Sequence, residues 1–299
     1  MCRRFYKTIF LFLSIALTIS CIILISFFPS APSFQDQVAN VYDPWHKCVN
    51  EKLREKKFNT TGFWFGSSKV FEFCRNASGV FERFNVKEFA NKDEVKYYAM
   101  SRNMSVREKS VHLSLGIGHD IEAELKIKET LPNSSFFGAD PESAINKELF
   151  SSQLGPFFAT AVGNASGVFD ALILPEQASS LTDYHKRKVK KIDLTHLIKN
   201  YVKVDFFDNV FIDIELDEYN IFPYFYRDGV LDRSNIVFCQ FNIEVHEGNR
   251  QRKGEFRRFF SQILEDKKYM IYQDFLLNHH RLFLINFTDQ KCLSKYLHL

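Results

Sequence analysis

The chain has 299 residues, a formal net charge of +3 and a typical share of apolar and charged residues, although 33 of its residues are Phe. This length allows one large domain with an appendage, and the composition excludes disorder over most of the chain. With the three basic residues before the first apolar segment set aside, 36 Lys and Arg balance 36 Asp and Glu, and we predict no nucleic-acid partner.

Residues 8–28 form an uncharged apolar stretch of 21 residues, which as a helix spans about 31 Å, the thickness of a bilayer core. Arg3, Arg4 and Lys7 precede it, and it exceeds the roughly 7 to 15 apolar residues of a cleaved signal peptide. We therefore predict a signal anchor with residues 1–7 in the cytosol. The chain would be a single-pass type II membrane protein of the endoplasmic reticulum or Golgi, held by its N-terminal helix. Cleavage after Ala31 is the alternative, and it also delivers the body to the lumen.

Sequons and cysteines support a luminal body. N-glycosylation acceptors occur at Asn59, Asn76, Asn103, Asn133, Asn164 and Asn286. Four cysteines follow the anchor, namely Cys48, Cys74, Cys239 and Cys292. An even number is compatible with two disulfides. We expect Cys48 to pair with Cys74, because both lie outside the later strand pattern, and a free buried thiol is the alternative for Cys239.

Residues 29–109 are predicted to form a stem and a small helical cap. Residues 29–42 contain Pro, Ser and Gln with little periodicity, which is typical of a stem. Apolar residues recur near helical spacing after the Asp-Pro step at residue 43, so a helix over residues 43–57 is predicted. Residues 91–100 are a second helical candidate.

From residue 110 to 299 the pattern predicts strands and helices in alternation. Strand-like segments are residues 111–115, 135–139, 156–162, 210–214 and 235–245. Helical segments are residues 119–129, 143–149, 195–200 and 255–266. This order indicates an α/β fold with a doubly wound, largely parallel sheet. Residues 268–287 are expected to close the sheet as an antiparallel hairpin, and the basic cluster at residues 185–191 is expected to be a solvated strand edge or loop.

A glycine loop follows the first of these strands. Gly116 and Gly118 stand where the first strand turns into a helix, the position at which glycines allow a ligand to approach the backbone. Asp140 ends the second strand, 24 residues after Gly116, and an acidic residue there can bind ribose hydroxyls. The absence of a third glycine favours a nucleoside site over a dinucleotide site. A plain tight turn is the alternative.

The fourth strand ends in carboxylates. Asp213 and Glu215 are two residues apart, so alternation along a strand predicts that both lie on one face at its carboxyl end. They could orient a hydroxyl or amine, act as a base or bind a hard cation. Asp217 and Glu218 are assigned instead to a helix start, where acidic side chains favour the helix dipole.

The fifth strand ends in Glu244 and His246, which also share a face. His246 could bring an imidazole that titrates near neutral pH beside Asp213. The alternative is a pair of satisfied polar residues at a strand end. Residues 279–281, His-His-Arg, are assigned to structure or surface.

Five ordered motifs resemble the FkbM-type methyltransferases. They are LGIG at residues 115–118, GADP at 138–141, AVGNASG at 161–167, KID and Leu194 at 191–194, and IDIE at 212–215. The resemblance implies a Rossmann-like class I methyltransferase sheet that uses S-adenosylmethionine for O-methylation. Gly116 and Gly118 would then approach the methionine end, Asp140 would hold the ribose, and Ala161 and Val162 would lie near the adenine.

The proton of the acceptor must be removed during O-methylation. Asp213, Glu215, Glu244 and His246 are the catalytic candidates, with His246 or Asp213 as base and Glu215 orienting the acceptor. The acceptor is expected to be a hydroxyl of a glycan, lipid or small molecule.

Three departures from the family pattern leave alternatives open. Ser114 replaces the acidic residue before the glycine loop, Leu216 replaces the Gly after Glu215, and His119 followed by an Asp is unusual after the loop. A catalytically degenerate binding protein is one alternative. Another is a type II Golgi glycosyltransferase with a DxD-like metal site at Asp213, whereas the methyltransferase interpretation requires no metal.

Overall fold

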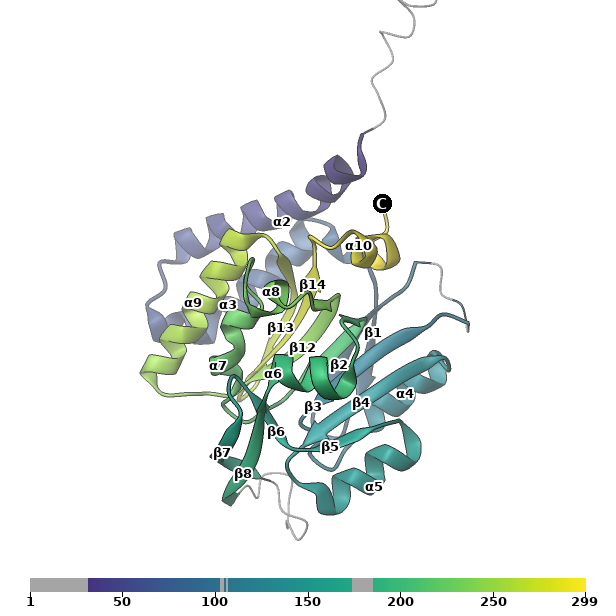
Figure 1. Ribbon diagram of the computed structural model, residues 1–299. Coiled ribbons are helices and arrows are strands. Elements are labelled where there is room, and N and C mark those ends of the chain that lie inside the picture. The colour runs from purple at the N-terminus through teal and green to yellow at the C-terminus, as the bar shows by residue number, and fades with distance from the viewer. Residues whose placement is uncertain (1–31, 103–104, 106, 174–184) are drawn as a thin grey trace, which may run out of the picture. The chain divides into compact units, whose positions relative to one another are not determined.

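The computed structural model describes residues 32–102, 105, 107–173 and 185–299 (Figure 1). The chain divides into two compact units, Met1–Ala39 and Asn40–Leu299. The predicted anchor at residues 8–28 and the sequon at Asn103 lie outside the described residues. Within the described ranges, none of the helices has the length and apolar character needed to cross a membrane.

The core of the second unit is a seven-stranded sheet in the order β13-β14-β12-β10-β3-β4-β5. The strands are β3 (Ser110–Leu115), β4 (Ser134–Asp140), β5 (Phe157–Ala159), β10 (Asn209–Ile212), β12 (Gln240–Val245), β13 (Tyr269–Leu276) and β14 (His280–Asn286). The strands from β5 to β12 pair in parallel, and β14 lies antiparallel between β12 and β13. This is the strand order of a Rossmann-like class I methyltransferase sheet, and the predicted α/β fold and C-terminal hairpin are confirmed.

Helices lie on both sides of this sheet (Figure 1). They are α4 (Glu122–Thr130), α5 (Ser143–Gln153), α6 (Leu194–His196), α7 (Glu218–Ile221), α8 (Val230–Arg233) and α9 (Arg250–Asp266), with short segments η2 (Leu197–Val202) and η3 (Phe222–Tyr224). Helix α9 shows why the sequence folds this way. Phe256, Phe259, Phe260 and Ile263 are buried at the spacing of one helical face. The helix begins five residues before the predicted start because Asn249 caps it, accepting a hydrogen bond from the Arg252 amide.

The N-terminal region contains α2 (Phe34–Lys56), α3 (Thr60–Ala77), η1 (Val80–Arg83) and the hairpin β1 (Asn85–Ala90) and β2 (Val95–Met100). The helix predicted over residues 43–57 exists but begins at Phe34, with Pro44 inside it. The helix predicted over residues 91–100 is wrong, because β2 pairs antiparallel with β1.

Side-chain amides of β12 form hydrogen bonds with the backbone of β2 and hold that strand in its extended conformation. Asn242 accepts from the Tyr97 amide and donates to the Tyr97 carbonyl, both at 2.8 Å. Gln240 does the same with Ala99, at 2.6 and 3.0 Å. The two residues on each strand are two apart, so one edge of the hairpin is fixed to one face of the sheet. The turn of the hairpin reaches the glycine-loop edge, where the Lys92 amide donates to Asp120.

A small sheet, β6 (Ala161–Gly163), β8 (His185–Asp193) and β7 (Gly167–Ile173), stands beside the main one. Strand β8 carries the basic cluster, which is largely exposed apart from Lys191 and the half-buried Val189, as expected for a strand edge. A further short pair joins β9 (Phe206–Phe207) to β11 (Val237–Phe238).

The described residues contain two disulfides. Cys48 and Cys74 join α2 to α3, which confirms the predicted pair. Cys239 pairs with Cys292 of α10 (Gln290–Tyr296), so Cys239 is not a free thiol. The first bond joins two N-terminal helices, and the second joins α10 to the residue before β12.

The sequons divide by exposure. Asn59, Asn76, Asn133 and Asn164 are exposed. Asn286 is buried; its amide donates to the Phe238 carbonyl and its oxygen accepts from the Asp289 amide. The sixth predicted acceptor is therefore wrong for the folded chain, because a buried, bonded amide cannot carry a glycan.

Candidate active site

The glycine loop follows β3 at the carboxyl edge of the sheet. Gly116 has φ of 81°, and a Cβ there would lie 1.8 Å from the carbonyl oxygen of Asp213. Gly118 has φ of 58° and has open space where a Cβ would stand. Only glycine adopts these conformations without strain. Gly116 is thus required by the close approach of the segment after β10, whereas the open side of Gly118 faces no protein atom within 4 Å.

Asp140, predicted to bind ribose, holds the loop. Its Oδ2 accepts from the amides of Ile117 at 2.7 Å and Gly118 at 3.4 Å, and its Oδ1 accepts from the amide of Glu142 at 2.7 Å. Burial raises the pKa of Asp140, although these hydrogen bonds oppose the rise. The Asn146 side chain also donates to this carboxylate, so four donors of the protein surround it.

Ser114 lies where the FkbM-type pattern has an acidic residue, and a carboxylate is nevertheless present. The Ser114 hydroxyl donates to Glu124 of α4 at 2.8 Å, and Lys96 lies 3.3 Å from the same oxygen. All three side chains are buried. The helix after the loop supplies the acidic group that the strand lacks.

Ala161 and Val162, predicted to lie near the adenine, are buried in β6. This strand pairs with β8 and lies beside β4 and α7. The proposed contact with adenine stays a prediction.

Asp213 and Glu215 come together by a turn and not by strand alternation. Strand β10 ends at Ile212, and Glu215 and Leu216 have φ of 50° and 75°. The alternation argument was therefore wrong, although both carboxylates do reach the same place. Leu216 adopts the left-handed conformation at the position where the related pattern has Gly.

His246 is the centre of this cluster. Its Nε2 lies 3.3 Å from Glu215 and 3.7 Å from Asp213, and its Nδ1 lies 3.0 Å from Glu218. Burial alone would lower the pKa of His246, but hydrogen bonds to Glu215 and Glu218 and the charges of Glu218 and Asp213 raise that pKa to about 12. The imidazole is thus held as a cation at neutral pH.

The two other predicted carboxylates have raised pKa values. Burial and the charge of Glu244 raise the pKa of Asp213 well above its usual value, which His246 opposes. Burial and Glu94 raise the pKa of Glu244 to about 7, which Arg281 opposes. All four predicted catalytic side chains therefore lie in one interacting group.

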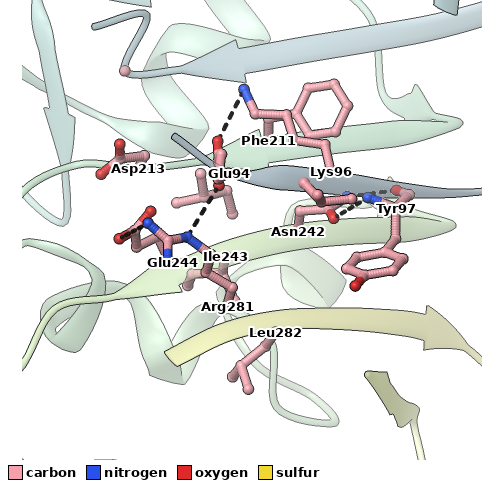
Figure 2. Close-up of a pocket in the computed structure, with 13 residues that line it drawn as sticks. Glu94, Lys96, Tyr97, Phe211, Asp213, Asn242, Ile243, Glu244, Arg281 and Leu282 are labelled. Carbon is pink, nitrogen blue, oxygen red and sulfur yellow. Dashed lines mark hydrogen bonds and ion pairs between the residues drawn. The ribbon is translucent and has the colours of Figure 1, made fainter. Parts of the chain in front are cut away.

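A chain of ion pairs runs from this group to the hairpin (Figure 2). Arg281 lies 3.2 Å from Glu244 and 3.7 Å from Glu94, and Glu94 lies 3.4 Å from Lys96. The cavity beside these side chains, which Asp213 also lines, measures about 10 Å³, room for about one water molecule. The sequence analysis missed Glu94 and Lys96, because their placement depends on the hairpin that was predicted as a helix.

Glu218 was also missed. It begins α7, as predicted, but its side chain is fully buried and accepts from the backbone amide of His246 at 2.7 Å as well as bonding the ring. Asp217 instead pairs with Lys191 at 3.0 Å, which agrees with its assignment outside the site. The run of acidic residues after Asp213 indicated a functional segment, but it did not distinguish the buried Glu218 from Asp217.

Residues 279–281 divide between structure and site. His280 is buried between Asp274 and the carbonyl of Trp64, as expected for a structural residue. Arg281 joins the ion pairs described above. The ring of His279 lies 4.5 Å from that of His246, and its Nδ1 accepts from the Glu247 amide.

The chain was compared with known protein families, sequences and structures. No protein-family model matches the chain. An uncharacterized protein of Caenorhabditis elegans is 23% identical over 272 residues, covering 88% of this chain and 81% of that protein. Among solved structures, a fibrillarin of Aeropyrum pernix in complex with S-adenosyl-L-methionine is similar at a TM-score of 0.35 and 10% identity, covering 62% of this chain and 70% of that one.

The fibrillarin of Methanococcus jannaschii is similar at a TM-score of 0.35 and 11% identity, covering 69% of this chain and 84% of that one. Likeness at this level carries no argument about activity. The strand order itself carries the assignment, and the second unit has the Rossmann-like fold of class I methyltransferases.

Proposed function

We propose that the second unit is an S-adenosylmethionine-dependent O-methyltransferase of FkbM type. The observation that carries the proposal is the strand order, in which the antiparallel β14 stands between β12 and β13. Ligands of such sheets bind beyond the carboxyl ends of the central strands. At that edge the chain carries its glycine loop, Asp140 and the cluster around His246.

The residues of the glycine-loop edge fit the cofactor. Gly118 has open space beside its Cα, and Asp140 ends β4, where a carboxylate can accept a hydrogen bond from a ribose hydroxyl. Gly116 and Gly118 would approach the methionine end, and Ala161 and Val162 the adenine. Bound S-adenosylmethionine supplies a methyl group on a positively charged sulfur.

Asp213 is the base in this proposal. Burial and the charge of Glu244 raise the pKa of Asp213, which makes this carboxylate a stronger proton acceptor than an ordinary Asp. His246, held as a cation by Glu215 and Glu218, cannot accept a proton at neutral pH. Glu215 would orient the acceptor hydroxyl, and Glu244 keeps the pKa of Asp213 high.

Cofactor binding is the first test. The purified full chain is dialysed against labelled S-adenosylmethionine, and we expect saturable binding that Asp140→Ala abolishes. Glu142→Gln is the matched control, because Glu142 caps α5 and pairs with Arg187 but is not assigned to the ligand. A folded wild-type chain that binds no cofactor would refute the proposal.

Methyl transfer to a luminal extract tests the base. We expect Asp213→Asn to lower transfer by about 10²- to 10⁴-fold while cofactor binding persists. Glu247→Gln, which changes an exposed acid beside His246, should transfer at the wild-type rate. The acceptor would be a hydroxyl of a glycan, lipid or small molecule. A wild-type chain that binds cofactor but transfers to no acceptor would favour a degenerate binding protein.

The carboxylates after β10 also suit the glycosyltransferase alternative. Protection from thermal unfolding by a nucleotide sugar with Mn²⁺, without protection by S-adenosylmethionine, would favour that alternative. The strand order is the reason we rank it second.

We further propose a type II membrane topology with a luminal body in the endoplasmic reticulum or Golgi. The two disulfides and the exposed sequons support an oxidising, glycosylating compartment. N-glycosidase treatment of the expressed chain should increase its gel mobility, and Asn286→Gln should leave the glycan number unchanged. Unchanged mobility of the wild type would contradict the luminal placement.

A further inference from the structure

The turn after β10 and the end of β12 bring together three atoms that can bind a metal ion. Asp213, Glu215 and His246 each offer one atom, and the three atoms lie within 4.8 Å of one another. His246 Nε2 is 3.3 Å from the Glu215 oxygen and 3.7 Å from the Asp213 oxygen. Ligands about 2.1 Å from a cation lie about 3 Å apart in octahedral coordination. We propose that Asp213, Glu215 and His246 bind a divalent cation.

Glu218 prepares His246 for this role. Its Oε1 lies 3.0 Å from His246 Nδ1 and accepts the Nδ1 hydrogen, so a cation that displaces the proton on Nε2 would meet a lone pair directed at Asp213 and Glu215. Metal-binding histidines commonly donate their second ring N–H to a carboxylate, which fixes the ring and its tautomer. Glu218 is therefore a positioning residue, held by the His246 backbone amide at 2.7 Å.

A second set of atoms shares His246 but fits less well. Glu244, His246 and His279 also lie within 4.8 Å of one another. His279 Nδ1 accepts a hydrogen bond from the Glu247 amide at 2.9 Å, so its neutral ring carries the hydrogen on Nε2. Glu244 is paired with Arg281 at 3.2 Å. The His279 and Glu244 side chains already have these partners, whereas Asp213 Oδ1 has no hydrogen-bond partner among the described residues.

The charge around His246 supports a bound cation independently of these distances. Asp213 Oδ1 and Glu218 Oε2 are buried atoms without a hydrogen-bond partner among the described residues, and the Glu218 side chain is fully buried. An unpaired buried carboxylate oxygen is costly. The carboxylates of Asp213, Glu215, Glu218 and Glu244 each lie within ion-pair distance of His246 or Arg281, so acidic groups outnumber these two cations.

Two carboxylates and one imidazole suit a first-row divalent ion. Imidazole is a common ligand of Zn²⁺, and carboxylates are preferred by Mn²⁺, so these two ions are the probes, with Mg²⁺ for comparison. Three protein ligands leave positions for water or a substrate oxygen. Cation binding is measured without S-adenosylmethionine, so its test is separate from that of the methyltransferase proposal. In the cation-bound chain the Asp213 oxygen would bind the cation and would not act as the base, so the two proposals describe alternative roles of this residue.

Direct titration tests the site. The purified full chain, freed of metal with a chelator, is titrated with Mn²⁺ while free Mn²⁺ is followed by electron paramagnetic resonance, and with Zn²⁺ by calorimetry. We expect one site per chain. Glu215→Gln and His246→Gln should each weaken binding by at least tenfold. His279→Gln and Asp217→Asn, matched controls from the neighbouring set and the neighbouring acid, should leave the affinity unchanged.

A double-mutant cycle isolates the positioning role of Glu218. Glu218→Gln should weaken binding by about 10- to 100-fold in the wild type but have no further effect in the His246→Gln background, because it acts through that ring. Circular dichroism identifies the variants that fold. If Glu218→Gln does not fold, the affinities of Glu215→Gln and His279→Gln still decide whether the cation site exists. Absence of binding at millimolar Mn²⁺ and Zn²⁺, or loss with His279→Gln but not Glu215→Gln, would overturn the proposal.

Discussion

Asp140 and Asp213 follow the two strands that flank β3, at the same edge of the sheet, yet their surroundings are opposite. Asp140 is surrounded by N–H donors from Ile117, Gly118 and Glu142. Asp213 lies among carboxylates and one imidazole. Burial raises the pKa of both, but hydrogen bonds oppose the rise at Asp140 and a like charge adds to it at Asp213.

This difference distinguishes two halves of the site. The half formed by β3 and β4 supports the glycine loop, and the half formed by β10 and β12 carries the reactive side chains. In the β3–β4 half, amides of the glycine loop bond within the protein: Gly116 to Ala139, and His119 to Asn146. In the β10–β12 half, Asp213 Oδ1 and Glu218 Oε2 have no hydrogen-bond partner among the described residues, and four carboxylates surround His246 and Arg281. In the β3–β4 half, Glu124 Oε2 is the comparable buried oxygen. Buried polar groups are normally satisfied, and exceptions are common at functional sites. We therefore expect changes in the first half to affect stability and cofactor binding, and changes in the second to affect cation or acceptor binding and the pH dependence of stability.

Removal of Lys96 should have the largest effect, because this cation serves both halves. It lies 3.3 Å from Glu124, behind the glycine loop, and 3.4 Å from Glu94. Lys96→Met would leave the buried Glu124 carboxylate uncompensated, and we expect a loss of about 3–5 kcal/mol in the free energy of unfolding. Urea titration measures it.

The control is the double variant Lys96→Met with Glu124→Gln. It removes both charges and should recover part of the loss. A single variant as stable as the wild type would show that Lys96 does not link the halves.

Gly116→Ala should cost about 3 kcal/mol of unfolding free energy. The added Cβ would meet the Asp213 carbonyl oxygen at 1.8 Å, and φ of 81° is strained for any other residue. Gly118→Ala has a similar φ but no clash, so about 1 kcal/mol is expected. Equal losses in urea titrations of the two variants would contradict the close approach of the halves.

Glu244 should make stability fall as pH rises. Its pKa is about 7 in the folded chain against 4.5 as a model value, so the folded chain binds more protons between these values. Between pH 4.5 and 7 the free energy of unfolding of the wild type should therefore fall by up to about 3 kcal/mol relative to that of Glu244→Gln. The figure is an upper bound, because Glu244→Gln also removes the ion pair with Arg281. Thermal or urea unfolding across this range measures it, with Glu247→Gln as the exposed control. A difference independent of pH would refute the raised pKa.

The sequence predicted those features that depend on local pattern. Strand β3 and the glycine loop follow from an apolar run ending in glycines, and the match of Asp140 to the end of β4 follows from spacing. Strand β2, which pairs with β1, was missed because its other edge is held by the side chains of Asn242 and Gln240, which are about 140 residues away. No local pattern encodes such a contact.

The site was predictable in its residues but not in its geometry. Alternation predicted that Asp213 and Glu215 share a face, whereas positive φ at Glu215 brings them together. The helix-dipole argument placed Glu218 correctly at a helix start, but could not give the direction of its side chain toward His246. Local rules place residues on elements, and packing decides which side chains meet.

The smallest expected effect concerns Leu216, which follows Glu215 in the reactive half. Its φ of 75° is a conformation in which glycine is free of strain and other residues are not. We expect Leu216→Gly to be more stable than Leu216→Ala by about 1 kcal/mol, the reverse of the order at an ordinary position. The pair of variants loses the same leucine contacts, so urea titration isolates the backbone. Equal stabilities, or a more stable Ala variant, would mean that the turn relaxes without the left-handed conformation, and the convergence of Glu215 on His246 would then need another cause.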